Sequence, residues 1–175
     1  MGGTEAGISE RNLCRGIMIF ASLGTMDMPF ERMAKAIDDW AAQCEEEVIV
    51  QTGHTSYPYR HAKAFGFCTK EEMKRYMEEA SMVILQGGWG TIDEAMEMGK
   101  RIVVMPRHNQ SEHIHDQFQL VRKLDSMGCI VGVFDEKELA EKIRLAQRHV
   151  FQPLQKGCAE GLIERKLKEW CGNHS

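Results

Sequence analysis

Short apolar runs that alternate with longer amphipathic stretches constrain the fold of this chain more than any other feature. The runs predict strands at residues 16–21, 47–52, 82–85, 101–105 and 129–134, with a weaker one at 62–68. The amphipathic stretches predict helices at residues 29–43, 69–80, 91–99 and 112–127, and from residue 135 onward. Strands that alternate with helices through short connections pair in parallel. The predicted fold class is therefore α/β, a Rossmann-like parallel sheet with helices on both faces.

Single residues set the predicted ends of several helices. Pro29 suits the first position of a helix, because its missing N–H is not needed there. Thr69 and Glu72 have the T-x-x-E spacing of a capping box. Gly128 is placed to end the helix at 112–127, and Asp135 to cap the next one.

A glycine-rich loop at residues 86–90 directly follows the apolar run at 82–85. A strand, a glycine loop and a helix N-terminus together present backbone N–H groups and a positive dipole end to a phosphate. Glycine suits such a loop because a side chain would block close backbone approach and positive φ angles. The spacing fits neither the dinucleotide fingerprint nor the Walker loop. By itself the loop predicts an anion at the start of a helix, with Thr91 as its first residue.

The predicted binding face follows from the fold class. In parallel sheets, ligands bind beyond the carboxyl ends of the strands. The loops that leave those ends are predicted at residues 22–25, 53–60, 86–90 and 107–115. We therefore expect the binding site to be built from these four loops.

Composition excludes several classes of protein. A length of 175 residues suits one domain, and a net charge of −4 argues against a nucleic-acid-binding surface. No apolar run approaches the ~20 residues of a membrane span, and the N-terminus lacks a signal-peptide core, so we expect a cytoplasmic location. The six cysteines lie far apart, which favours reduced thiols over disulfides or a zinc site.

Five ordered segments carry a resemblance to a known family. They are residues 20–25 with Pro29 and Phe30, residues 50–53, 87–94, 99–106 and 112–117. In this order, they are similar to the C-terminal, nucleotide-sugar-binding half of glycosyltransferase family 28, over roughly residues 16–147. The chain most resembles the short stand-alone members. These are the catalytic subunit of the eukaryotic dolichol-linked GlcNAc transferase and its bacterial counterparts in exopolysaccharide or capsule synthesis.

The resemblance implies one half of a GT-B architecture, which binds a UDP-sugar donor in its cleft. In short members, a membrane-anchored partner subunit supplies the acceptor half. The implied reaction is an inverting transfer to a lipid-linked acceptor at the cytoplasmic membrane face, with no metal, other cofactor or nucleic acid. In two-domain relatives the catalytic base lies in the N-terminal half, so no residue here is assigned that role. GlcNAc, galactose and glucuronic acid are all open as the donor sugar. The alternative function is a non-catalytic nucleotide-sugar-binding or regulatory module.

The resemblance also assigns roles to individual residues. The donor diphosphate is expected at Gly88, Trp89, Gly90 and Thr91, and across the cleft at Ser22, Gly24 and Thr25. The ribose is expected at Glu94, the uracil at Phe67, and the sugar at Arg107, His113, Asp116, Gln117 and Gln119. A carboxylate suits the ribose because it accepts two hydrogen bonds from a vicinal diol.

Structural alternatives exist for several of these residues. The glycines could simply serve a strand-to-helix turn, and residues 22–25 an ordinary turn. Thr91 and Glu94 have the spacing of a second capping box. Phe67 could be a core aromatic, which is the common role of phenylalanine.

The predicted domain organisation has three parts. A flexible leader at residues 1–14 precedes a nucleotide-sugar donor-binding domain at 15–150. A C-terminal segment at 151–175 contains a predicted amphipathic helix at about residues 159–170. This helix is expected to pack against the partner subunit or across the cleft, with ordinary core packing as the alternative.

Overall fold

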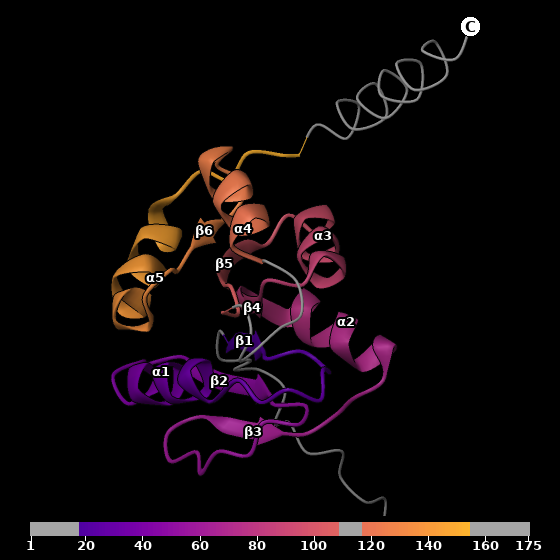
Figure 1. Ribbon diagram of the computed structural model, residues 1–175, viewed down its shortest axis with the longest axis vertical. Coiled ribbons are helices and arrows are strands. Elements are labelled where there is room, and N and C mark those ends of the chain that lie inside the picture. The colour runs from indigo at the N-terminus through magenta and orange to yellow at the C-terminus, as the bar shows by residue number, and fades with distance from the viewer. Residues whose placement is uncertain (1–17, 109–116, 155–175) are drawn as a thin grey trace, which may run out of the picture.

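A six-stranded parallel sheet forms the centre of the computed structural model (Figure 1). The structure describes residues 18–108 and 117–154. Across the sheet the strands run β3-β2-β1-β4-β5-β6. Their bounds are β1 Met18–Ser22, β2 Glu47–Gln51, β3 Lys63–Phe65, β4 Ala80–Gln86, β5 Arg101–Met105 and β6 Val131–Gly132. The predicted fold class is confirmed.

The helices cover both faces of this sheet. Their bounds are α1 Glu31–Ala41, α2 Lys70–Glu79, α3 Trp89–Glu97, α4 Gln117–Ser126 and α5 Leu139–Arg148, with a short 3₁₀ helix, η1, at Glu136–Glu138. In Figure 1, α1 and α5 lie on one side of the sheet, and α2 and α3 lie on the other. Two separate apolar cores result, one under α1 and α5 and one under α2, α3 and α4.

Strand β1 supplies both cores because successive side chains of a strand point to opposite faces. Ile19 and Ala21 lie in the core under α1 and α5, whereas Phe20 lies in the core under α2 to α4. All five residues of β1 are buried. This explains why the run at residues 16–21 has no period-two alternation.

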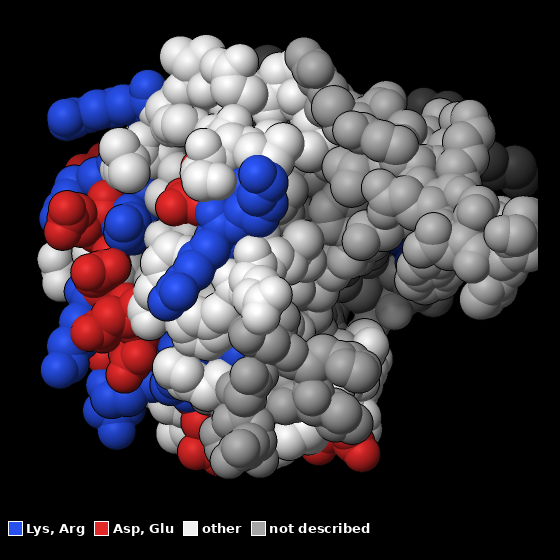
Figure 2. Space-filling view, turned by 45° about the horizontal axis from the view of Figure 1, so that its top comes forward, with Lys and Arg blue, Asp and Glu red and all other residues white. Residues whose placement is uncertain are grey.

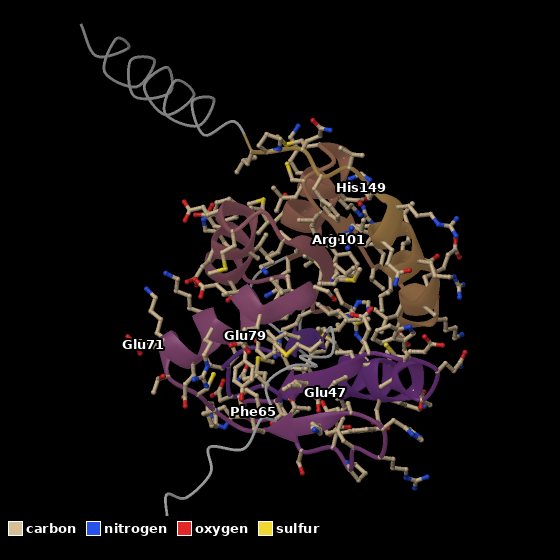
Figure 3. The ribbon with its side chains drawn as sticks, turned by 180° about the vertical axis from the view of Figure 1, so that it is seen from behind. Glu47, Phe65, Glu71, Glu79, Arg101 and His149 are labelled. Atoms are coloured by element: carbon tan, nitrogen blue, oxygen red, sulfur yellow. The ribbon has the colours of Figure 1, made fainter. Side chains whose placement is uncertain are left out.

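Stacked aromatic rings connect the edge of the sheet to its centre. The ring of Tyr76 in α2 stacks on Phe20 at 5.2 Å and on Phe65 of β3 at 5.1 Å, between ring centroids. Figure 3 labels Phe65 beside β3. Such pairs stabilise a fold by about 0.5–1.5 kcal/mol beyond their buried area. Strand β3 is only three residues long, shorter than the predicted 62–68, and is held at the sheet edge by its pairing with β2 and by the Phe65–Tyr76 contact.

The ends of the helices agree with the predictions where a local sequence motif determines them. They differ from the predictions where a residue distant in sequence makes the contact. The capping box of Thr69 and Glu72 is present, and Gly128 follows α4 with a φ of 72°. Pro29 is not the first helical residue, because α1 begins at Glu31. The N–H of Phe30, at the N-cap position, donates to Thr55 Oγ1 at 3.0 Å, so the start of α1 is fixed by another loop.

Several predictions fall on residues outside the described ranges. They are the leader at 1–14, the first part of the helix at 112–127 and the final helix at about 159–170. Within the described ranges, no helix combines the length and apolarity needed to cross a bilayer.

A buried carboxylate in α1 holds the long connection between β2 and β3. Asp38 is 2% exposed and accepts hydrogen bonds from the backbone N–H groups of Arg60 at 3.1 Å, His61 at 2.9 Å and Ala62 at 3.0 Å. Burial raises the pKa of this carboxyl group, but the three N–H groups outweigh burial and hold its pKa below the usual range.

The lowered pKa makes part of the stability pH-dependent. In the unfolded chain the carboxyl group has a pKa of about 3.9, so its contribution to the free energy of unfolding is complete above that pH. We expect this contribution to be lost as the pH falls through the lower pKa of the folded state. At pH 7, Asp38→Asn should cost about 1–3 kcal/mol, because an amide oxygen replaces a charged acceptor.

Urea unfolding between pH 7 and pH 3 measures both effects. Asp39→Asn removes the neighbouring charge, which is exposed and pairs with Lys35, and should change stability by no more than about 0.5 kcal/mol. Equal stability of Asp38→Asn and the natural protein at pH 7 would contradict this role for Asp38.

Candidate functional site

The carboxyl ends of the central strands meet at one edge of the sheet. Ser22 pairs in register with Gln51 of β2 and Leu85 of β4, and Gln86 pairs with Met105 of β5. The four predicted loops therefore leave the sheet side by side. The candidate site lies at this edge.

Helix α3 begins two residues earlier than predicted. Its first residue is Trp89, and Gly88 occupies the N-cap position with an extended backbone, φ −78° and ψ 123°. Thr91 is the third helical residue, so it cannot act as the N-cap, and the second capping box is absent. The start of α3 has no side-chain cap among the described residues. The first-turn N–H groups at residues 89–91 have no partners within the helix and remain suited to an anion.

The new start of α3 also changes the interpretation of Glu94. This half-buried residue lies in the second turn of the helix, beyond reach of the N-cap backbone. It lies three residues after Thr91, and residues at that spacing share a helix face. The capping box, which would explain Glu94 without a ligand, is therefore excluded. Its contact with a ribose stays a prediction.

The glycines in the loop at residues 86–90 do not have the positive φ angles that were predicted for them. The φ of Gly88 is negative, whereas Gly24 has a φ of 84° and Gly53 a φ of 55°. A Cβ atom on Gly87 would lie 2.6 Å from Oε1 of Gln117, and one on Gly88 would overlap the side chain of Gln86. Two side-chain amides therefore occupy the space that these glycines leave.

Gly90 differs from the other glycines at this edge. A Cβ atom there would meet no heavy atom within 4 Å. The fold of the described residues therefore does not require a glycine at this position, in the first turn of α3. The open space lies where a ligand would approach the helix start.

Side-chain hydrogen bonds join the carboxyl ends of β1 and β2 to the residue that follows β3. The Ser22 hydroxyl donates to Gln51 Oε1 at 2.7 Å, and Gln51 Nε2 donates to the carbonyl of Gly66 at 3.0 Å. Ser22 is 3% exposed, whereas Thr25 is exposed. In the structure, Ser22 thus joins two strands, and its predicted phosphate contact and that of Thr25 stay predictions.

Arg107 joins the loop after β5 to the loop after β1. The guanidinium donates through Nη2 to the carbonyl of Leu23 at 2.7 Å and through Nη1 to that of Met28 at 2.8 Å. Its Cζ lies 4.5 Å from the ring centroid of Phe30. The resemblance assigned Arg107 to the donor sugar, but the structure shows it positioning the loop after β1. A buried arginine with these carbonyl partners could not be recognised from sequence.

Gln117 is the next member of this network. The backbone N–H of Arg107 donates to Gln117 Oε1 at 3.0 Å, and Gln117 Nε2 donates to Gln86 Oε1 at 2.9 Å. Gln117 is 5% exposed, whereas Gln119 is exposed. Of the other residues predicted to contact the sugar, His113 and Asp116 lie outside the described residues. Gln86, which joins two loops, was not identified from sequence.

Phe67 is an exposed aromatic at the far end of the same edge. It is 56% exposed, and its ring centroid lies 4.9 Å from that of His54 in an edge-to-face arrangement. The alternative of a core aromatic is therefore wrong. An exposed aromatic pair beside the strand ends can stack on a planar base, and the uracil contact stays a prediction.

The described residues form neither a single basic patch on the face drawn in Figure 2 nor a cluster of metal ligands. On the face drawn in Figure 2, Lys and Arg lie among Asp and Glu instead of forming one basic patch. Within residues 18–108 and 117–154, no three His, Cys, Asp or Glu side chains converge to hold a metal ion.

Cys44, Cys68 and Cys129 are free thiols, and burial raises the pKa of each.

Comparison with known proteins gives one family and a group of similar folds. Residues 24–166 match the family described as the glycosyltransferase family 28 C-terminal domain. No curated protein matches the chain.

The similar solved structures share the fold at low sequence identity. The glycotransferase of kitacinnamycin has a TM-score of 0.59 at 18% identity, over 82% of this chain and 39% of that one. The glycosyltransferase SnogD from Streptomyces nogalater has a TM-score of 0.53 at 18% identity, over 82% and 38%. A protein described as a UDP-N-acetylglucosamine 2-epimerase, from Listeria monocytogenes, has a TM-score of 0.54 at 13% identity, over 91% and 46%. The chain spans less than half the length of these proteins.

The different demands on Gly53 and Gly90 can be tested by alanine substitution. In Gly53→Ala, the new Cβ overlaps the carbonyl of Gly24 at a positive φ, which should cost about 2–4 kcal/mol. In Gly90→Ala, the Cβ meets open space, so stability should be unchanged or rise by up to about 1 kcal/mol. Urea unfolding of both variants measures the difference. Equal stabilities would contradict the packing of the first loop on the end of β2.

Proposed function

The chain belongs to the family of glycosyltransferase family 28 C-terminal domains, and from this we propose that it is the donor-binding catalytic subunit of an inverting glycosyltransferase. It would move a sugar from a UDP-sugar to a lipid-linked acceptor. Its fold is Rossmann-like and corresponds to one half of a GT-B glycosyltransferase. A membrane-anchored partner subunit would supply the acceptor half at the cytoplasmic membrane face.

The uncapped start of α3 carries this proposal. The helix begins at the carboxyl edge of the sheet, directly after the close-packed Gly87 and Gly88, and its first turn has no side-chain cap among the described residues. A diphosphate there would accept from the first-turn N–H groups and meet the positive end of the helix dipole. The open space at Gly90 leaves room for its oxygen atoms.

The rest of the nucleotide can be arranged around that diphosphate. Glu94, one turn further along α3, would accept hydrogen bonds from the two ribose hydroxyls. Phe67 and His54 form the exposed aromatic pair at the same edge, where the uracil ring would stack. The sugar would lie toward the connection between β5 and α4.

Catalysis in this proposal is shared between two subunits. The N–H groups of α3 would stabilise the charge that develops on the UDP leaving group. An acceptor hydroxyl must also lose a proton, and a positioned general base accelerates that step. We assign this base to the partner subunit, because in two-domain relatives that group comes from the N-terminal, acceptor-binding half. No metal or other cofactor is proposed.

Thermal unfolding with and without UDP tests donor binding. At a UDP concentration of about 100 times the Kd, binding to the folded state adds about 2.7 kcal/mol, which for a protein of this size raises the Tm by roughly 5–10 °C. Glu94→Gln should weaken UDP binding about tenfold, because the amide accepts less strongly from the ribose hydroxyls.

Glu97→Gln is the matched control for Glu94→Gln. It removes the same charge from the same helix, one turn further from its start, and should leave UDP binding unchanged. The proposed function is wrong if millimolar UDP produces no shift in the Tm of the natural protein. The role of Glu94 is wrong if both variants bind UDP equally.

Co-expression with a membrane-anchored acceptor half tests whether the chain takes part in catalysis. We expect sugar transfer to a lipid-linked acceptor only when both proteins are present, with this chain alone nearly inactive. Incorporation of radiolabelled sugar into the lipid fraction is the measurement. UDP-sugar binding without transfer would support the alternative, a non-catalytic nucleotide-sugar-binding or regulatory module.

A further inference from the structure

The side-chain amide of Gln86 lies between the two loops of the candidate diphosphate site. Gln86 is the last residue of β4. A Cβ atom on Gly24, in the loop after β1, would lie 3.1 Å from Gln86 Nε2, and one on Gly88, at the start of α3, would overlap the same nitrogen. The amide nitrogen therefore lies against the backbone of both loops.

A chain of hydrogen bonds fixes which end of this amide faces the loops. The backbone N–H of Arg107 can only donate, so the Gln117 side chain must present its oxygen there, as it does at 3.0 Å. Gln117 Nε2 then donates to Gln86 Oε1 at 2.9 Å. The oxygen of Gln86 is thereby occupied, and its NH₂ group faces Gly24 and Gly88. The orientation follows from the network of partners.

The NH₂ group of Gln86 has no acceptor in the part of the chain that the structure describes. Its side chain takes part there in one hydrogen bond, in which Oε1 is the acceptor. Gln86 is half-buried, and its Nε2 lies beside Gly24 and Gly88, at the edge of the candidate site. Donors left in a fixed direction and partly removed from water are suited to an acceptor-rich ligand.

We infer that Gln86 Nε2 donates a hydrogen bond to a diphosphate oxygen of the bound donor nucleotide, beside the first-turn N–H groups of α3. This inference rests on the proposed function and names one more residue of that site. Gln117 and the backbone N–H of Arg107 are positioning groups, because they orient the amide without touching the ligand.

The positions of these two glutamine side chains also explain three glycines at this edge of the sheet. Gly87 makes room for Gln117, and Gly24 and Gly88 make room for Gln86. Their spacing follows the positions of two glutamine side chains, so it need not match the dinucleotide or Walker pattern.

Two variants of Gln86 test the inference through the ratio of UDP to uridine affinity, measured by isothermal titration calorimetry. Gln86→Glu still accepts from Gln117 but cannot donate. Gln86→Met cannot donate either and adds no charge. We expect each to lower UDP affinity about tenfold to a hundredfold, since the lost bond is to a charged group, and to leave uridine affinity unchanged. Gln43→Glu adds the same charge at an exposed site on the chain after α1 and should alter neither affinity.

The outcomes separate this inference from the function on which it rests. If the natural protein binds UDP and both Gln86 variants bind it equally well, the Gln86 contact is wrong and the function stands. The contact is also wrong if only Gln86→Glu loses UDP affinity, because charge repulsion then accounts for the loss. Equal losses for UDP and uridine would also contradict the contact, because Gln86 would then only support the shape of the site. If the natural protein binds neither ligand, both the function and the inference fail.

Discussion

The buried guanidinium of Arg107 is the interaction on which the carboxyl edge of the sheet depends. It holds the loop after β1 through the carbonyls of Leu23 and Met28, while its own backbone N–H orients Gln117. Through Gln117, the same residue reaches Gln86 and the start of α3. Loops whose bonded residues are up to 84 positions apart in sequence are thus held in one arrangement before any ligand arrives. Such preorganisation reduces the cost of ordering a binding site.

The fold was largely predictable because its signals are local. Apolar runs such as residues 101–105 are long enough to identify a buried strand, and the capping box at Thr69 and Glu72 lies within four residues. The errors arose where a distant residue decides the outcome. Thr55 accepts from the N–H of Phe30 at the N-cap of α1, and the short edge strand β3 packs against Tyr76. Neither partner could be identified from the neighbouring sequence.

The candidate site was predictable by position but not by contact. The four loops do leave one edge of the sheet, because parallel pairing aligns the strand ends. Which side chain faces the ligand depends on hydrogen bonds between loops, and these placed Arg107 and Gln117 in positioning roles. The resemblance identified Gly88 and Gly90 equally, yet only Gly88 is packed against a side chain. Packing of this kind cannot be identified from the spacing of glycines in the sequence.

The bare N-cap of α3 links helix stability to ligand binding. A serine or aspartate at a helix start typically adds about 1 kcal/mol relative to alanine. Gly88 is only a few tenths of a kcal/mol less favourable, but it has no side chain to accept from the first-turn N–H groups. In the proposed function, the nucleotide phosphate replaces the missing cap, so the first turn is complete only in the complex. Ordering of this turn and occupancy of the site are then one equilibrium. A stronger cap in the chain itself would compete with the donor for the same N–H groups.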